Sequence, residues 1–76
     1  MDEVSLIKLK EKEEAVIVSI LGGRMATKRL ADLGLTPGTK IKVLRKALLF
    51  GPVEIEARGS ALVLGQGLAA KVIVKK

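Results

Sequence analysis

Apolar and polar positions alternate over several short stretches of the chain, a pattern that predicts β-strands. The longest stretch runs from Ala15 to Leu21, where even-numbered and odd-numbered positions are both mainly apolar. Because a strand with two apolar faces needs cover on both sides, we expect this one to be central in its sheet or covered by another element. Further strands are expected over Lys40–Lys46, Val53–Arg58, Ala61–Leu64 and Lys71–Lys75, with a short strand or extended lead-in over Leu6–Lys10.

Within these strands the alternation assigns each side chain to the interior or to the surface. A tight connection at Gly59-Ser60 joins the third strand to the fourth, and a loop or single helical turn fills 65–70. The inward set is apolar and comprises Ile41, Val43, Val53, Ile55, Ala57, Val72 and Val74. The outward set is charged and comprises Lys40, Lys42, Lys46, Glu54, Glu56 and Arg58.

One segment has the period of a helix instead. Over Arg24–Leu33, residues Ala26, Leu30 and Leu33 recur at i, i+4 and i+7, which predicts a short helix with one apolar face. Gly34 suits the left-handed position after a helix, and Leu35 can supply the accompanying apolar contact. The next four residues, Thr36-Pro37-Gly38-Thr39, fit a type II turn.

Five or six short strands with tight turns favour a small barrel, because closure removes exposed strand edges. We therefore predict a mainly β, SH3-like barrel with one short inserted helix that plugs an end. The 76 residues are long enough for a single domain, residues 1–76, and contain no linker or repeat.

Net charge is +6 and is unevenly distributed. Residues 1–14 carry five acidic and three basic side chains, whereas residues 15–76 carry eleven basic and three acidic ones. A basic body can meet nucleic acid, an anionic membrane surface or an acidic protein, or can serve solubility alone. Phe50 is the one aromatic residue, so the stacking platforms typical of single-strand binders are absent from the sequence, and we expect no specific nucleic-acid partner.

The composition argues against chemistry at an active site. The chain has no His, Cys or Tyr, so the commonest general base and the strongest nucleophile are missing, and we expect no enzyme. Without imidazole or thiolate ligands we expect no tight transition-metal site and no cofactor, although Glu11, Glu13 and Glu14 could attract a divalent ion weakly.

Two features are candidates for binding a partner. Arg24, Lys28 and Arg29 form a basic ridge on the predicted helix, at a place where cations oppose the helix dipole. The connection between the second and third long strands carries Leu48, Leu49 and Phe50, where polar turn residues are usual. This apolar segment either folds over a barrel mouth or protrudes beside Arg45 and Lys46 to meet a partner. The ridge either meets an acidic surface or is tolerated by a helix that tertiary contacts anchor.

The N-terminus is acidic, unlike a secretory signal, and the longest apolar run is seven residues, whereas a spanning helix needs about 20. We therefore expect a cytoplasmic protein without direct membrane insertion.

Four segments together resemble the FeoA family of bacterial ferrous-iron transport accessory proteins. Their order and spacing agree over about residues 4–75, and the segments are Ile20–Gly23, Arg29–Ile41, Gly51–Ile55 and Ala70–Val74. The resemblance implies an SH3-like barrel, a regulatory or scaffolding role in iron transport, and a membrane G-protein transporter of ferrous iron (FeoB) as partner, with a homo-oligomer possible. Two alternatives stay open: an SH3-like module of iron-dependent transcriptional repressors, and a basic RNA- or ribosome-associated barrel.

Overall fold

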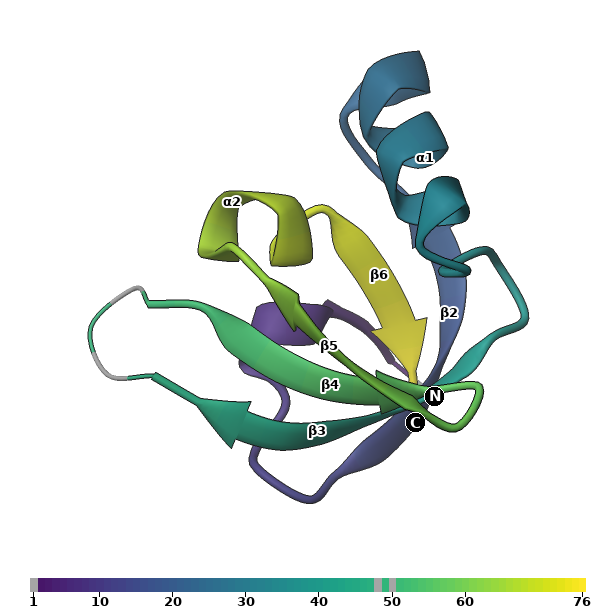
Figure 1. The fold of residues 1–76 in the computed structure, drawn as a ribbon. Coiled ribbons are helices and arrows are strands. Elements are labelled where there is room, and N and C mark those ends of the chain that lie inside the picture. Colours follow the sequence, from purple (N-terminus) through teal and green to yellow (C-terminus); the bar gives the residue numbers. More distant parts are fainter. Residues whose placement is uncertain (1, 48, 50) are drawn as a thin grey trace.

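The alternating segments form one antiparallel sheet of six strands, in the order β1-β6-β2-β3-β4-β5 (Figure 1). The computed structural model describes residues 2–47, 49 and 51–76. Curling of this sheet brings the mainly β chain into the expected SH3-like barrel. The strands are β1 (Glu3–Ser5), β2 (Glu14–Ile20), β3 (Lys40–Lys46), β4 (Val53–Ala57), β5 (Ser60–Leu64) and β6 (Val72–Lys75). The helices are η1 (Leu6–Lys8, a 3-10 turn), α1 (Gly23–Asp32) and α2 (Gln66–Ala69).

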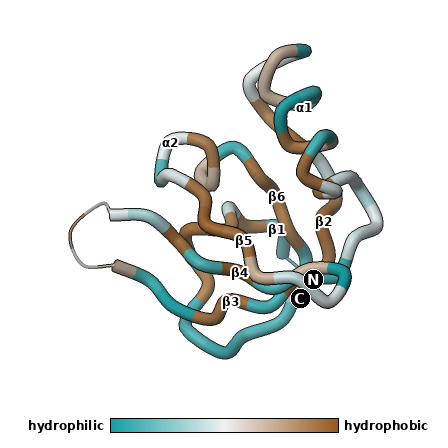
Figure 2. Tube along the Cα trace, viewed as in Figure 1, coloured by the Kyte–Doolittle hydropathy of each residue, from teal (hydrophilic) through white to brown (hydrophobic). Residues whose placement is uncertain are grey.

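Strand β2 is central and pairs with both β3 and β6, although its second apolar face is not covered, since Val16 is 39% exposed. Its pairing with β6 shifts between Ile17 and Ser19, which bends the strand where the barrel curves. Hydrophobic residues run along β2, β5 and β6 (Figure 2). The inward set expected from β3, β4 and β6 is buried throughout: Ile41, Val43, Val53, Ile55, Ala57, Val72 and Val74.

The N-terminal segment differs from the expectation of a strand or extended lead-in over Leu6–Lys10. The strand lies earlier, at Glu3–Ser5, and η1 follows it. The reason is that Leu6 and Leu9 are both buried, and a spacing of three is the period of a 3-10 turn rather than of a strand. Ser5 fixes the turn, because its hydroxyl accepts from the amide of Ile7 and donates to the carbonyl of Ala70.

Helix α1 occupies the predicted segment, but it does not plug the barrel. Its buried residues are Ala26 and Leu30, and the rest of the helix projects away from the strands (Figure 1). Leu33, expected on the inner face, is 44% exposed, whereas Leu35 is buried. The helix ends at Asp32, one residue before the periodic pattern does, so the chain turns and Leu35 takes the core position.

The end of α1 confirms the left-handed glycine. Gly34 has φ +85, its amide donates to the carbonyl of Ala31, and the amide of Leu35 donates to the carbonyl of Leu30. These two bonds are those of a Schellman motif. The following Thr36–Thr39 turn is of type II, with φ +94 at Gly38 and a hydrogen bond from the amide of Thr39 to the carbonyl of Thr36.

Strand β3 contains a bulge that the alternation does not reveal. Val43 pairs with Ile55 but Arg45 pairs with Glu54, so Leu44 is the extra residue. Beyond the bulge the faces exchange, and Lys46 pairs with the buried Val53. Lys46 is therefore not an outward strand residue as predicted.

The β4–β5 connection is also one residue earlier than expected. Arg58 and Gly59 form the two-residue turn, with φ +53 and +81, and Ala57 pairs with Ser60. Two positive φ values are those of a type I′ hairpin turn. Arg58 is consequently a turn residue and not the last residue of β4.

In the part of the chain that the structure describes, no helix is long and apolar enough to cross a membrane.

Candidate interaction surfaces

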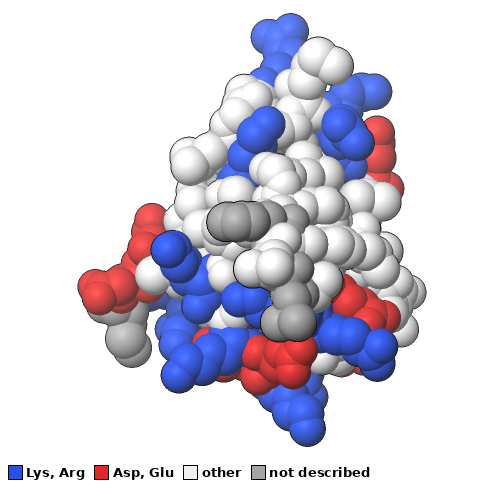
Figure 3. Space-filling view, turned by 90° about the vertical axis from the view of Figure 1, so that its left-hand side faces the viewer, with Lys and Arg blue, Asp and Glu red and all other residues white. Residues whose placement is uncertain are grey.

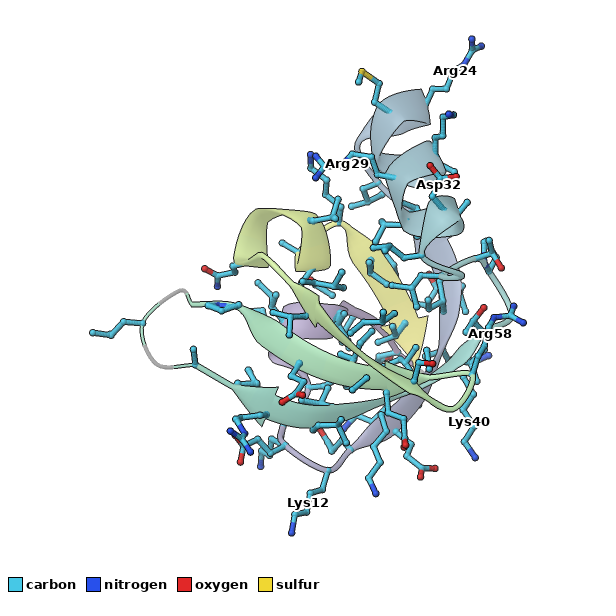
Figure 4. The ribbon with its side chains drawn as sticks, viewed as in Figure 1. Lys12, Arg24, Arg29, Asp32, Lys40 and Arg58 are labelled. Atoms are coloured by element: carbon cyan, nitrogen blue, oxygen red, sulfur yellow. The ribbon has the colours of Figure 1, made fainter. Side chains whose placement is uncertain are left out.

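The three cations that the sequence assigns to one ridge lie on two different faces of helix α1. Arg24 and Lys28 lie one turn apart, on a stripe that continues to Asp32. Arg29 follows Lys28 by one residue and so lies about 100° further round the helix. Figure 4 shows Arg29 on the side toward α2 and Arg24 at the far end, pointing away from it. The cations therefore spread over about 140° of the helix circumference instead of forming a single row.

The same end of α1 exposes apolar side chains that sequence reasoning missed. Met25 is 77% exposed and Leu21, just before the helix, is 55% exposed. Helical periodicity identifies the buried positions, Ala26 and Leu30, and assigns no role to apolar residues between them. The sequence does contain a signal for Met25, because this residue lies off the apolar face of the predicted helix and next to Arg24.

Leu49 is the large apolar side chain that the described part of the β3–β4 connection exposes to solvent. Leu49 is 88% exposed and has φ +52, a left-handed conformation that a leucine seldom adopts. Leu48 and Phe50 lie outside the described residues. The amide of Ala47 donates to the carbonyl of Pro52 and closes the base of the connection. Beside Leu49 is a hollow of about 250 Å³, lined also by Ile7, Lys46, Ala47, Gly51, Val53 and Gln66.

The cations expected beside this connection have internal partners. The ammonium of Lys46 donates to the carbonyls of Ile7 at 2.8 Å and Leu9 at 2.9 Å, so it closes the end of η1. Arg45 lies 3.9 Å from Glu54 across the outer face of the sheet. Lys46 is therefore committed to the fold, and the rim of the connection is less basic than the sequence indicates.

Each of the three N-terminal carboxylates Glu11, Glu13 and Glu14 has a different partner. Glu11 accepts from the amide of Lys46, Glu14 pairs with Lys40 at 3.3 Å, and Glu13 pairs with Lys76 at 2.7 Å. The amide of Lys10, which donates to Glu13 at 2.7 Å, is the main cause that lowers the pKa of this carboxyl, with Lys76 next. Among residues 2–47, 49 and 51–76, no three His, Cys, Asp or Glu side chains come together as a metal site would need.

A hollow of about 360 Å³ lies on the outer face of β3 and β4, next to the Arg58-Gly59 turn. Charged side chains of both signs line it: Glu14, Lys40, Lys42, Glu56 and Arg58. Lys42 lies opposite Glu14 and Glu56 in the neighbouring strands, and Lys40 pairs with Glu14 at 3.3 Å. Glu56, predicted to face outward, is exposed.

The molecule is a small SH3-like barrel with a helix inserted between β2 and β3. Apolar side chains are exposed on the β3–β4 connection and at the outer end of α1. These features define its class as a compact β-domain with exposed apolar surface. A sequence model described as the FeoA domain matches residues 4–76, and the chain accordingly belongs to the FeoA family.

Individual relatives agree with this assignment. A protein of Methanocaldococcus jannaschii named "Putative Fe(2+) transport protein A" is 41% identical over 66 residues, which are 87% of this chain and 78% of that protein. A crystal structure of an iron uptake regulatory protein (FeoA) superposes with a TM-score of 0.89 at 36% identity, covering 99% of this chain and 97% of that one.

The repressor alternative has support in the fold alone. A manganese-dependent transcriptional repressor in complex with manganese matches with a TM-score of 0.89, but at 16% identity and over 37% of its own length, against 99% of this chain. The shared part is a barrel of the same architecture, and at this identity it carries no information about function.

Proposed function

We propose that this chain is a cytoplasmic accessory protein of ferrous-iron uptake, which binds a membrane G-protein iron transporter of the FeoB type and catalyses no reaction itself. Membership of the FeoA family and the similarity to an iron transport protein A support the role in iron transport. The lack of His, Cys and Tyr supports binding rather than catalysis.

The observation that carries the proposal is the exposure of Leu49. A leucine that is 88% exposed at a left-handed backbone position stabilises neither the core nor the turn. A side chain of this kind contributes when a partner covers it, because burying a leucine is worth about 1.5–3 kcal/mol. The hollow beside Leu49 gives a partner side chain a place to enter from the same side.

The test replaces Leu49 by asparagine, which tolerates the left-handed conformation and removes the apolar contact. We expect binding of Leu49→Asn to the detergent-solubilised transporter to weaken about tenfold, equivalent to about 1.4 kcal/mol, with an unchanged melting temperature. Sedimentation of the same variant reports whether association between copies, the other expected partner, also uses Leu49.

Val63→Thr is the matched control, because Val63 is 66% exposed on β5 and threonine keeps the β-branched shape. It should bind the transporter as the unmodified chain does. Equal binding by Leu49→Asn and the unmodified chain would show that the connection is not the contact surface. A lowered melting temperature of Leu49→Asn would show that Leu49 belongs to the core.

A further inference from the structure

The outer end of α1 combines exposed apolar side chains with cations. Met25 and Leu21 are among the most exposed large apolar residues in the described chain. Arg24 and Lys28 lie on one stripe of the same two turns, and Arg29 lies on another. Apolar atoms on a projecting element, flanked by long basic side chains, are typical of a surface that enters the headgroup layer of a bilayer.

The local charge is not balanced within the fold. Ion pairs in the described part of the chain join Lys40 to Glu14, Arg45 to Glu54 and Lys76 to Glu13, and none involves α1. Segment 21–32 contains one carboxylate, Asp32, which lies at the inner end of the helix. Figure 3 shows basic side chains with one acidic group beside them at the upper end of the molecule, and side chains of both signs at the lower end.

The helix is also built against its own electrostatics. Its first turn has no acidic residue, and its N-cap, Gly22, supplies no side-chain hydrogen bond. Arg24 therefore adds positive charge to the positive end of the helix dipole, and an external anion would offset both. Lys71 adds a further cation to this region. Its side chain packs against Gly22, since its Cδ lies 2.7 Å from the position that a Cβ on Gly22 would take.

The shape decides between a bilayer and an acidic protein. A stable protein interface buries about 800 Å² on each side, with close complementarity. The outer end of α1 projects from the barrel and consists of about two helical turns, so a protein partner would need further contacts to reach that area (Figures 1 and 4). A fluid headgroup layer adapts to a projecting tip and surrounds it with phosphates.

We propose that the outer end of α1, defined by Leu21, Arg24, Met25, Lys28 and Arg29, binds the anionic surface of a lipid bilayer. Met25 and Leu21 enter the headgroup region, and the basic side chains pair with lipid phosphates around them. The contact is peripheral. It holds the barrel at the membrane surface with the β3–β4 connection free, and it does not depend on the proposed transporter partner.

The test is sedimentation of the full chain with phosphatidylcholine vesicles that either contain or lack phosphatidylglycerol. We expect binding to the anionic vesicles, weakening with added salt, and little binding to the neutral ones. Arg24→Gln with Lys28→Gln should lower the partition coefficient about fivefold for each cation removed. Met25→Ser should lower it several-fold at every salt concentration, because the apolar contribution is not screened.

The matched control is Lys12→Gln with Lys40→Gln, which removes the same charge from the opposite end of the molecule (Figure 4). It should bind anionic vesicles several-fold more tightly than the α1 double variant. Equal loss in the two double variants would overturn the assignment to α1. No binding to anionic vesicles, or an unchanged partition for Met25→Ser together with equal competition by polyglutamate, would overturn the lipid surface itself. The vesicles contain no transporter, so a negative result leaves the proposed function standing.

Discussion

Arg58 is a single side chain that joins three elements. Its Nε donates to the carbonyl of Gly34 at 3.0 Å, and its Nη2 lies 3.3 Å from the hydroxyl of Thr39. Thr39 is the buried polar residue of the described core, and its hydroxyl also contacts the carbonyl of Gly34. The β4–β5 turn thereby fixes the end of α1 and the turn after it.

Gly34 is the residue on which this junction depends. A Cβ at φ +85 is strained, and at Gly34 it would also lie 3.4 Å from Cδ of Arg58. We expect Gly34→Val to lower the free energy of unfolding by about 1–2 kcal/mol, measured by thermal or denaturant melting. The control is Gly67→Ala in α2, where a Cβ meets nothing within 4 Å, and it should not destabilise the chain. Equal melting of Gly34→Val and the unmodified protein would contradict the left-handed assignment.

Glu13 gives the stability a dependence on pH. Its pKa in the folded chain is lowered by the amide of Lys10 and by Lys76, so protonation costs more in the folded state than in the unfolded state. The contribution is present above the unfolded pKa of about 4.3 and is lost as pH falls through the lower folded pKa. The melting temperature should therefore fall less steeply between neutral pH and pH 3 for Glu13→Gln than for the unmodified chain. Parallel curves for the two proteins would contradict the role of Glu13.

Strand β3 shows at the scale of an element why Lys46 looked like a surface residue. Alternation assigns faces only while the register is unbroken, and the bulge at Leu44 reverses the assignment for every later position. Nothing in the residue types of β3 marks the bulge. The closing of the end of η1 by the Lys46 ammonium therefore follows from strand pairing and not from composition.

Removing that ammonium should be costly. Lys46→Met keeps the apolar stem but leaves the carbonyls of Ile7 and Leu9 without their donor. We expect a loss of about 1–3 kcal/mol in the free energy of unfolding, measured with denaturant. Arg45→Met on the same strand is the control, because its pair with Glu54 at 3.9 Å is exposed and should contribute little. Equal effects of the two substitutions would contradict the role of Lys46.

For the whole molecule, sequence pattern predicted the barrel, the helix and its glycine, and the order of strands along the chain. It failed for features that depend on how the elements pack against one another. These are the exposure of Leu33, the strand before Leu6 and the projection of α1 from the barrel. Of the candidate binding residues, Leu49 stood out because an apolar turn breaks a local rule. Met25 was not singled out, although its place off the apolar face of the helix indicates that it is exposed.

The ligand set of the whole chain leads to a prediction about iron. The sequence offers no imidazole or thiolate, and the described N-terminal carboxylates are engaged by lysines and backbone amides. Ferrous iron binds hard carboxylates alone only weakly when they are not gathered at one point. Anaerobic titration of the purified protein should therefore give no stoichiometric binding at low micromolar iron. Saturation at one iron per chain in that range would sink this prediction.

Unequal attachment of the two ends of α1 sets how the helix opens. Leu30 and the bonds around Gly34 hold its inner end, whereas the outer end is held by the small buried Ala26 and by the amide of Leu21, which donates to the carbonyl of Lys71. Amide hydrogen exchange should consequently form a gradient along the helix. The amides of the outer turns exchange through fraying that costs little free energy, and the amide of Leu35 exchanges only when the barrel itself opens. We therefore expect the outer turns of α1 to open at a lower free energy than the barrel.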